Sequence, residues 1–161
     1  MWKGGVRVIL TDEKNRILMV CQNHEGKKIW MVPGGGIEEG ENSLEAAKRE
    51  MVEETGLQVE ISELIWHVEE VSPERGQRFV NFFLAEQVGG EARLGEDPEL
   101  NSDQQVLVEL DYFTREEIEK LPLVYPEYLR DELWDILEGR QNPGTYKIRN
   151  SDFTNIHERR E

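Results

Sequence analysis

The segment from Gly35 to Leu57 constrains the fold of this chain more than any other part of the sequence. It begins in the run Pro33-Gly34-Gly35-Gly36, which ends a short apolar stretch and lets the backbone approach a ligand closely. A helix is predicted over Asn42–Thr55, because Asn42 and Glu45 have capping-box spacing and Gly56 supplies a C-terminal stop. We therefore expect a glycine-rich loop that leads into a well-delimited helix.

Three glutamates lie close together on this predicted helix. Glu50, Glu53 and Glu54 have i, i+3, i+4 spacing and share about a third of the helix circumference. Like charges at i, i+4 are mildly destabilising, so a cation among them would stabilise the helix. Several carboxylates suit Mg²⁺ or Mn²⁺ better than zinc. A solvated acidic face is the alternative, and the helix alone does not decide between the two.

The other apolar runs predict a mixed, mostly β core with a few packed helices. On the helix already described, the stripe Leu44, Ala47 and Met51 is expected to face that core. The predicted strands are Val6–Leu10, Arg16–Cys21, Ile29–Val32, Gln58–Val71, Arg78–Gln87 and Val106–Leu110. The further predicted helices are Thr114–Lys120 and Pro126–Leu137.

Two polar stretches complete the predicted organisation. Gly89–Asp103 is polar, acidic and contains glycine, and we expect a long loop of the kind that is usually functional or mobile. Residues 139–161 contain few apolar groups and are expected to form a C-terminal tail or docking arm, behind a single domain at residues 1–138.

The charge of the chain restricts its partners. The 161 residues include 34 acidic and 19 basic side chains, which give a net charge of −15, while the 37% hydrophobic content is too high for a disordered chain. An acidic protein repels the backbone of a nucleic acid, so no nucleic-acid partner is expected. A substrate that carries phosphates would need a divalent metal to neutralise it.

The location is expected to be cytoplasmic. Cys21 is the single cysteine, so no intramolecular disulfide can form, which is typical of a reducing compartment. The first residues do not have the pattern of a secretory signal, and no apolar run reaches the length of a membrane span, so no membrane partner is expected.

The whole segment has a further property. Gly35 is followed after five residues by Glu41, and after seven more by the run Arg49-Glu50-Met51-Val52-Glu53-Glu54-Thr55-Gly56-Leu57. This pattern resembles the complete Nudix box, the signature loop–helix–loop of the Nudix hydrolases. The resemblance implies the Nudix fold, an α/β class (α+β) with an α/β/α sandwich around a mixed β-sheet.

The resemblance also implies roles for residues of the box. Glu50, Glu53 and Glu54 would bind Mg²⁺ or Mn²⁺, with a contribution from Gly35, and Arg49 would orient the carboxylates. Glu50 or Glu53 would act as the base that activates water, unless that base is a carboxylate on the later loop. The loop candidates are Glu96, Asp97, Glu99 and Asp103. The implied reaction is attack of water on a phosphorus of a nucleoside diphosphate linked to another moiety.

The substrate is less closely defined by the sequence. Pro73 lies sixteen residues beyond Leu57, a spacing that resembles the subgroup that hydrolyses ADP-ribose, although a proline is also ordinary in a turn. The main competitor is a house-cleaning enzyme, similar to MutT, for ordinary or oxidised nucleoside triphosphates. Lys28, Arg75 and Arg78 are candidate contacts for the substrate.

Two other expectations follow from the resemblance. A Nudix domain that only binds a nucleotide-sugar, as a sensor, is the alternative of a different class, but such domains commonly lose a box glutamate and this chain keeps all of them. Members of the family are often dimers, so a homodimer is among the expected partners, together with the small nucleotide substrate.

Overall fold

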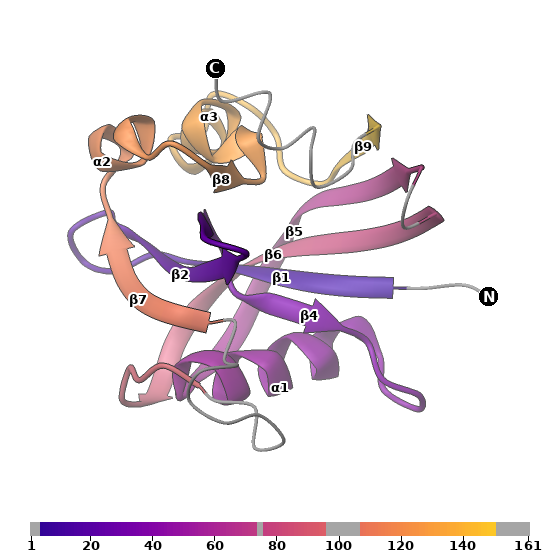
Figure 1. The fold of residues 1–161 in the computed structure, drawn as a ribbon, viewed down its shortest axis with the longest axis horizontal. Helices are drawn as coiled ribbons and strands as arrows, with labels where there is room; N and C mark the ends of the chain where they lie inside the picture. Colours follow the sequence, from indigo (N-terminus) through magenta and orange to yellow (C-terminus); the bar gives the residue numbers. More distant parts are fainter. Residues whose placement is uncertain (1–3, 74–75, 96–106, 151–161) are drawn as a thin grey trace.

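Two β-sheets form the centre of the molecule (Figure 1). The structure is a computed structural model, and it describes residues 4–73, 76–95 and 107–150. A five-stranded sheet has the order β4-β1-β6-β5-β9, and a four-stranded sheet has the order β7-β2-β3-β8. The strands of the first sheet are β4 (Gly34–Gly36), β1 (Gly4–Leu10), β6 (Gly76–Gly90), β5 (Leu57–Ser72) and β9 (Thr145–Asn150). Those of the second are β7 (Leu107–Phe113), β2 (Ile17–His24), β3 (Lys27–Met31) and β8 (Val124–Tyr125).

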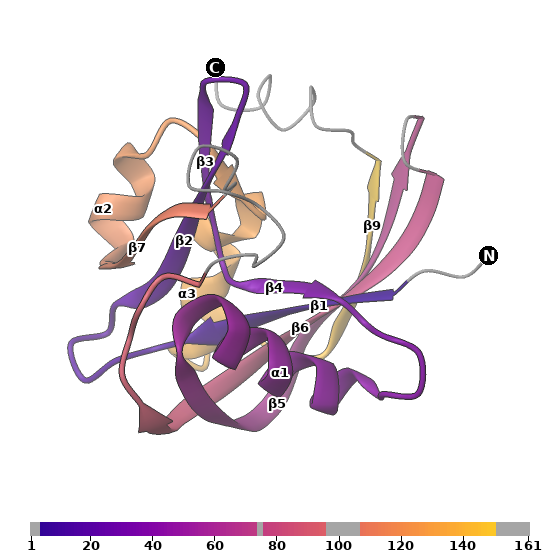
Figure 2. The same cartoon turned by 60° about the horizontal axis from the view of Figure 1, so that its bottom comes forward.

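Helices cover the sheets from two sides (Figures 1 and 2). Helix α1 (Ser43–Thr55) packs on one face of the five-stranded sheet, and α2 (Arg115–Lys120), the 3₁₀ turn η1 (Glu127–Arg130) and α3 (Glu132–Leu137) lie on the other side. This arrangement confirms the expected α/β/α sandwich. The β layer consists of two mixed sheets, whereas a single mixed sheet was expected.

The alternation of side chains along the strands gives two cores. Val6 and Val8 of β1 belong to the cluster that packs against α1, whereas Ile9 belongs to the cluster on the opposite face. On α1 the buried residues are Ala46, Ala47, Met51 and Thr55. The expected core position at Leu44 is therefore wrong, because its side chain is 47% exposed and Ala46 faces the sheet.

Helix α1 is delimited as its sequence predicts. The Asn42 side chain accepts a hydrogen bond from the Glu45 N–H at 2.8 Å, and the Glu45 carboxylate accepts one from the Asn42 N–H at 2.9 Å. At the other end Gly56 has φ = 74°, and its N–H donates to the Val52 carbonyl. These caps satisfy backbone groups that a helix end leaves unpaired, and they fix the register of its carboxylates.

Several elements differ from the predicted ones. Gly34–Gly36 does not simply end a strand but pairs with β1 as β4, in so close an approach that a Cβ on Gly34 would lie 2.0 Å from the Val6 carbonyl oxygen. The helix predicted over Pro126–Leu137 is interrupted at Asp131, whose φ of −139° is not helical and which caps α3. Strand β6 continues to Gly90, into the predicted loop.

Strand β9 lies in the segment that was expected to be a tail or docking arm. Thr145–Asn150 pairs in parallel with β5, from Trp66 opposite Thr145 to Val71 opposite Asn150, and it forms the edge of the five-stranded sheet. Its apolar residues Tyr146 and Ile148 are exposed whereas Arg149 is buried, which inverts the usual pattern of a strand with an apolar buried face. Within the described ranges, no helix has the length and apolar composition that a membrane crossing needs.

Candidate metal and phosphate site

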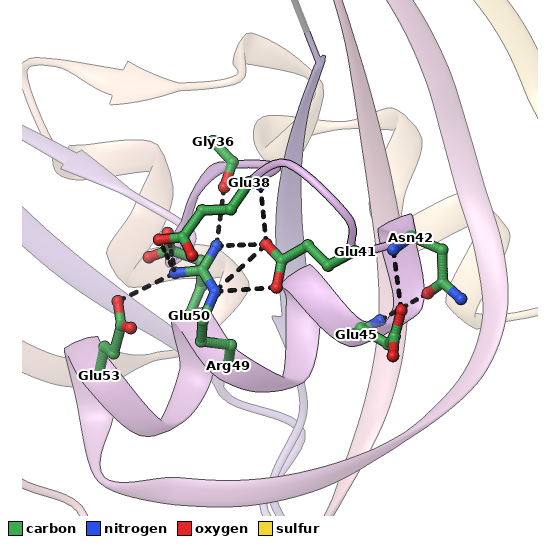
Figure 3. Close-up of polar contacts among 8 residues, drawn as sticks. All are labelled: Gly36, Glu38, Glu41, Asn42, Glu45, Arg49, Glu50 and Glu53. Carbon is green, nitrogen blue, oxygen red and sulfur yellow. Dashed lines mark hydrogen bonds and ion pairs between the residues drawn. The ribbon is translucent and has the colours of Figure 1, made fainter.

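Arg49 joins the loop before α1 to the carboxylates of the helix (Figure 3). Its guanidinium donates to Glu41, at 2.6 Å through Nη2, and to the Gly36 carbonyl at 2.9 Å. Through Nη1 it also donates to Glu50 at 3.0 Å and to Glu53 at 3.1 Å. The hydrogen bonds from Arg49 hold the pKa of the Glu41 carboxyl below its usual range. Arg49 therefore fixes the glycine-rich loop against the helix and orients two of its glutamates.

Glu50 lies directly beneath the glycines of β4. Its side chain is 12% exposed, and a Cβ on Gly35 would lie only 2.4 Å from Glu50 Oε1. Burial raises the pKa of Glu50, against the lowering effect of Arg49. Glycine at position 35 is thus required for this carboxylate to approach the backbone.

Glu54 is the most deeply buried carboxylate of the three. It accepts a hydrogen bond from the Gly34 N–H at 3.1 Å. Burial raises the pKa of Glu54 to about 7; the charges of Glu50 and Glu53 act in the same direction, while Arg7 and the Gly34 N–H oppose the shift. A bound cation would favour the ionised form of such a group.

The donors of this cluster fit a hard divalent cation. They are carboxylate oxygens together with the carbonyl groups of β4, the ligand type that Mg²⁺ and Mn²⁺ prefer. Within the described part of the chain, no three acidic, histidine or cysteine side chains lie as they stand in a ready-made metal cage. The Glu53 side chain is 55% exposed and paired with Arg49, so it has room to turn towards a cation.

A cavity of about 830 Å³ opens beside this cluster. It is lined by the start of β1, by the glycines of β4, by the loop over residues 37–41, and by Arg78 and Val80 of β6. Arg7 also lines it, although no motif in the sequence points to this residue. The signal for Arg7 is a charge inside the apolar run Val6-Arg7-Val8, which indicates a side chain on a functional face of a strand.

Of the other predicted contact residues, the structure describes Lys28, which is not brought to this site. Lys28 lies on β3, is 57% exposed, and pairs with Glu109 at 3.6 Å. Arg75, Glu96, Asp97, Glu99 and Asp103 lie outside the described residues. Gly95, the last described residue before four of them, donates its N–H to the Glu54 carbonyl at 2.8 Å.

Fold and site together define a protein in which an acidic loop and helix lie beside a cavity of about 830 Å³. A comparison with known families shows the class to which it belongs. A family model described as the NUDIX domain matches residues 1–131. The chain therefore belongs to the Nudix hydrolase family, as the sequence predicts, and this family uses divalent metal ions.

Particular relatives indicate the range of activities. The chain is 28% identical over 118 residues to the RNA pyrophosphohydrolase of Zymomonas mobilis, which covers 64% of this chain and 73% of that protein. It is 35% identical over 101 residues to the 8-oxo-dGDP phosphatase of Mus musculus, which covers 62% of this chain but 30% of that protein. In fold it is similar to a crystal structure of an ADP-ribose pyrophosphatase from Streptococcus suis, with a TM-score of 0.62, 20% identity, and coverage of 92% of this chain and 99% of that one.

Proposed function

We propose that this protein is a metal-dependent hydrolase of the pyrophosphate bond in small nucleotide derivatives. The observation that carries the proposal is the Arg49-centred arrangement of Glu41, Glu50 and Glu53, placed beside a cavity of about 830 Å³. Membership of the Nudix hydrolase family and the pyrophosphohydrolase relatives support this activity. We propose Mg²⁺ as the metal, with Mn²⁺ as the alternative, on the all-oxygen donor set.

The residues of the site are proposed to have separate roles in metal binding, orientation and proton transfer. Glu50, Glu53 and Glu54, with the backbone at Gly35, would hold the cation. When bound, the cation supplies charge neutralisation for the pyrophosphate and lowers the pKa of a bound water. Arg49 would keep the carboxylates oriented. Glu53, the most exposed of the three, is proposed to accept the proton of the attacking water, with Glu50 as the alternative.

The substrate that we favour is ADP-ribose or a related nucleotide-sugar. Pro73 supports it, together with the overall likeness in fold to an ADP-ribose pyrophosphatase. The second candidate is an ordinary or oxidised nucleoside triphosphate, and the similarity to an 8-oxo-dGDP phosphatase favours an oxidised nucleotide. RNA pyrophosphohydrolases are also among the relatives, but the net charge of −15 opposes a grip on a long RNA backbone.

A substrate screen with a matched pair of variants tests the proposal. Wild-type protein would be incubated with Mg²⁺ and ADP-ribose, nucleotide-sugars, dinucleoside polyphosphates, ordinary and oxidised nucleoside triphosphates, or a 5′-triphosphorylated RNA oligomer. Glu53→Gln should reduce kcat by about 100-fold or more, because it removes both a charge at the metal and the proposed base. Glu60→Gln, whose side chain is 65% exposed on β5, is the control and should retain full activity.

Two outcomes would contradict these assignments. If no compound is hydrolysed, the protein is a binding domain rather than an enzyme. If Glu53→Gln is as active as the wild type, the assignment of Glu53 as metal ligand and base is wrong. If a triphosphate is consumed faster than ADP-ribose yields AMP, the favoured substrate is wrong and the second candidate replaces it.

A further inference from the structure

Two arginines face the cavity from the sheet side. Arg7 of β1 and Arg78 of β6 lie on neighbouring parallel strands, on the face of the five-stranded sheet opposite α1. Gly5 lies on the same face as Arg7 and pairs with Val80. Gly5 and Val80 line the same cavity as the two arginines.

A buried carboxylate holds one of these arginines. Glu70 of β5 is 6% exposed and accepts a hydrogen bond from Arg78 Nε at 2.9 Å. The other oxygen of Glu70 accepts a short hydrogen bond from the Tyr125 hydroxyl and lies 3.6 Å from Arg149 Nη1. Arg78 is thus anchored at its Nε while its side chain remains 34% exposed at the cavity.

Strand β9 completes this network from the C-terminal segment. Arg149 is 3% exposed, pairs with Glu127 at 2.6 Å, and lies 5.1 Å from the centre of the Tyr125 ring. Residues 132–161 lie beyond the part of the chain that the family model matches. Arg149 therefore lies outside the matched part of the chain, whereas Tyr125 and Glu70, which it contacts, lie within it.

Arg7 contributes a second positive charge to the cavity. Its Nη1 donates to the Val32 carbonyl at 2.7 Å, and its guanidinium lies 5.5 Å from the centre of the Tyr125 ring. Among the described residues no carboxylate forms a salt bridge with it. A guanidinium that faces a cavity and is held by a carbonyl and a ring is well suited to receive an anion.

The cavity therefore has two walls of opposite charge. The loop wall carries Glu38, Glu39 and Glu41, and the sheet wall carries Arg7 and Arg78. The sheet wall attracts an anion, and the loop wall attracts a cation. A phosphate group that arrives with a divalent metal satisfies both.

We propose that Arg7 and Arg78 bind the phosphate chain of the substrate on the side away from the metal, and that Glu70, Tyr125 and Arg149 position them. Arg7 and Arg78 are the binding residues, and the other three act through them. The assignment rests on the proposed function, because it takes the substrate to be a metal-bound pyrophosphate compound.

The first experiment measures anion binding without metal or turnover. Inorganic pyrophosphate would be titrated by calorimetry into metal-free protein from which chelator has been dialysed away. Arg7→Gln and Arg78→Gln should each weaken binding by about tenfold, because each removes a charge-assisted contact. Arg140→Gln, which changes an exposed arginine paired with Asp135, is the control and should bind as tightly as the wild type. Equal affinity of the Arg7→Gln/Arg78→Gln double variant and the wild type, or no binding by the wild type, would overturn the proposal.

The second experiment separates positioning from general stability. Tyr125→Phe keeps the ring but removes the hydroxyl that donates to Glu70, and Arg149→Lys keeps the charge but loses the forked contact with Glu127. With saturating Mg²⁺, both variants should raise KM by about threefold to tenfold and change kcat by less than about twofold, since each loosens a contact to Arg78. A fall in kcat at unchanged KM, or no change in either constant, would contradict the positioning role.

The two proposals fail in different ways. If no nucleotide is hydrolysed, the proposed function is wrong. Loss of pyrophosphate binding in the double variant would still support Arg7 and Arg78 as anion-binding residues. If hydrolysis proceeds and the double variant has the KM and the pyrophosphate affinity of the wild type, the assignment of Arg7 and Arg78 as phosphate-binding residues is wrong. The hydrolase assignment then stands.

Discussion

At the scale of single residues, the site depends on how closely carboxylates approach a backbone without side chains. Glu50 lies under Gly35, and Glu54 accepts the Gly34 N–H, so the β4 glycines provide both room and a donor. The same proximity concentrates negative charge, which Arg49 offsets at Glu50 and Arg7 offsets at both Glu50 and Glu54. The carboxylates of Glu50 and Glu54 can therefore take these positions because the residues of β4 next to them are glycines.

A pair of neighbouring glycines tests this dependence. Gly35→Ala should weaken Mg²⁺ activation by about tenfold or more, because the new Cβ would lie 2.4 Å from Glu50 Oε1 and displace that carboxylate. Gly36→Ala is the matched control, since a Cβ there meets no atom within 4 Å. The measurement is the Mg²⁺ concentration for half-maximal activity, and similar values for the two variants would show that Gly35 has no special role.

At the scale of the element, α1 carries charges that oppose its own formation. Glu50 and Glu54 repel each other at i, i+4, and the last turn of the helix contains no basic residue to offset the dipole. The capping box at Asn42 and the left-handed Gly56 compensate at the two ends. The helix thus combines strong boundaries with a functional surface that costs stability.

Metal should therefore stabilise the folded protein as well as activate it. Mg²⁺ at about 100 times its Kd should add about 2.7 kcal/mol to the free energy of unfolding, because the cation binds the folded state only. Thermal unfolding with Mg²⁺, with chelator, and with NaCl at matched ionic strength measures the effect. Glu53→Gln should show a smaller increase in Tm than the wild type. Equal increases in Tm with MgCl₂ and NaCl would mean that ionic screening, rather than a metal site, is responsible.

At the scale of the whole molecule, the described C-terminal segment is part of the folded body. Strand β9 extends the five-stranded sheet, and its Arg149 is buried between Glu70, Glu127 and Tyr125. This contact links residues from β5, β8, η1 and β9, which are far apart in the sequence. The homodimer expected from the family resemblance remains a prediction.

Removal of the buried charge should destabilise the molecule more than removal of an exposed one. Arg149→Ala should lower the free energy of unfolding by about 3 kcal/mol, because it leaves Glu127 and Glu70 with incomplete partners in a buried site. Arg140→Ala, which is 56% exposed, should change it by less than about 0.5 kcal/mol. Urea unfolding followed by circular dichroism measures both. Equal effects of the two variants would show that the β9 contact contributes little to stability.

The sequence by itself determined the helix, its caps, the acidic cluster and the family, because these depend on residues close together along the chain. The spacing from Gly35 to Leu57 is local, so hydrogen-bond geometry and helical periodicity relate it directly to structure. Only the tertiary structure decided which distant side chains share a face. Arg7, Arg78 and Arg149 meet around Tyr125 because parallel pairing of β1 with β6 and of β5 with β9 brings them together. Strand order and register depend on the packing of the whole chain, and no local pattern encodes them.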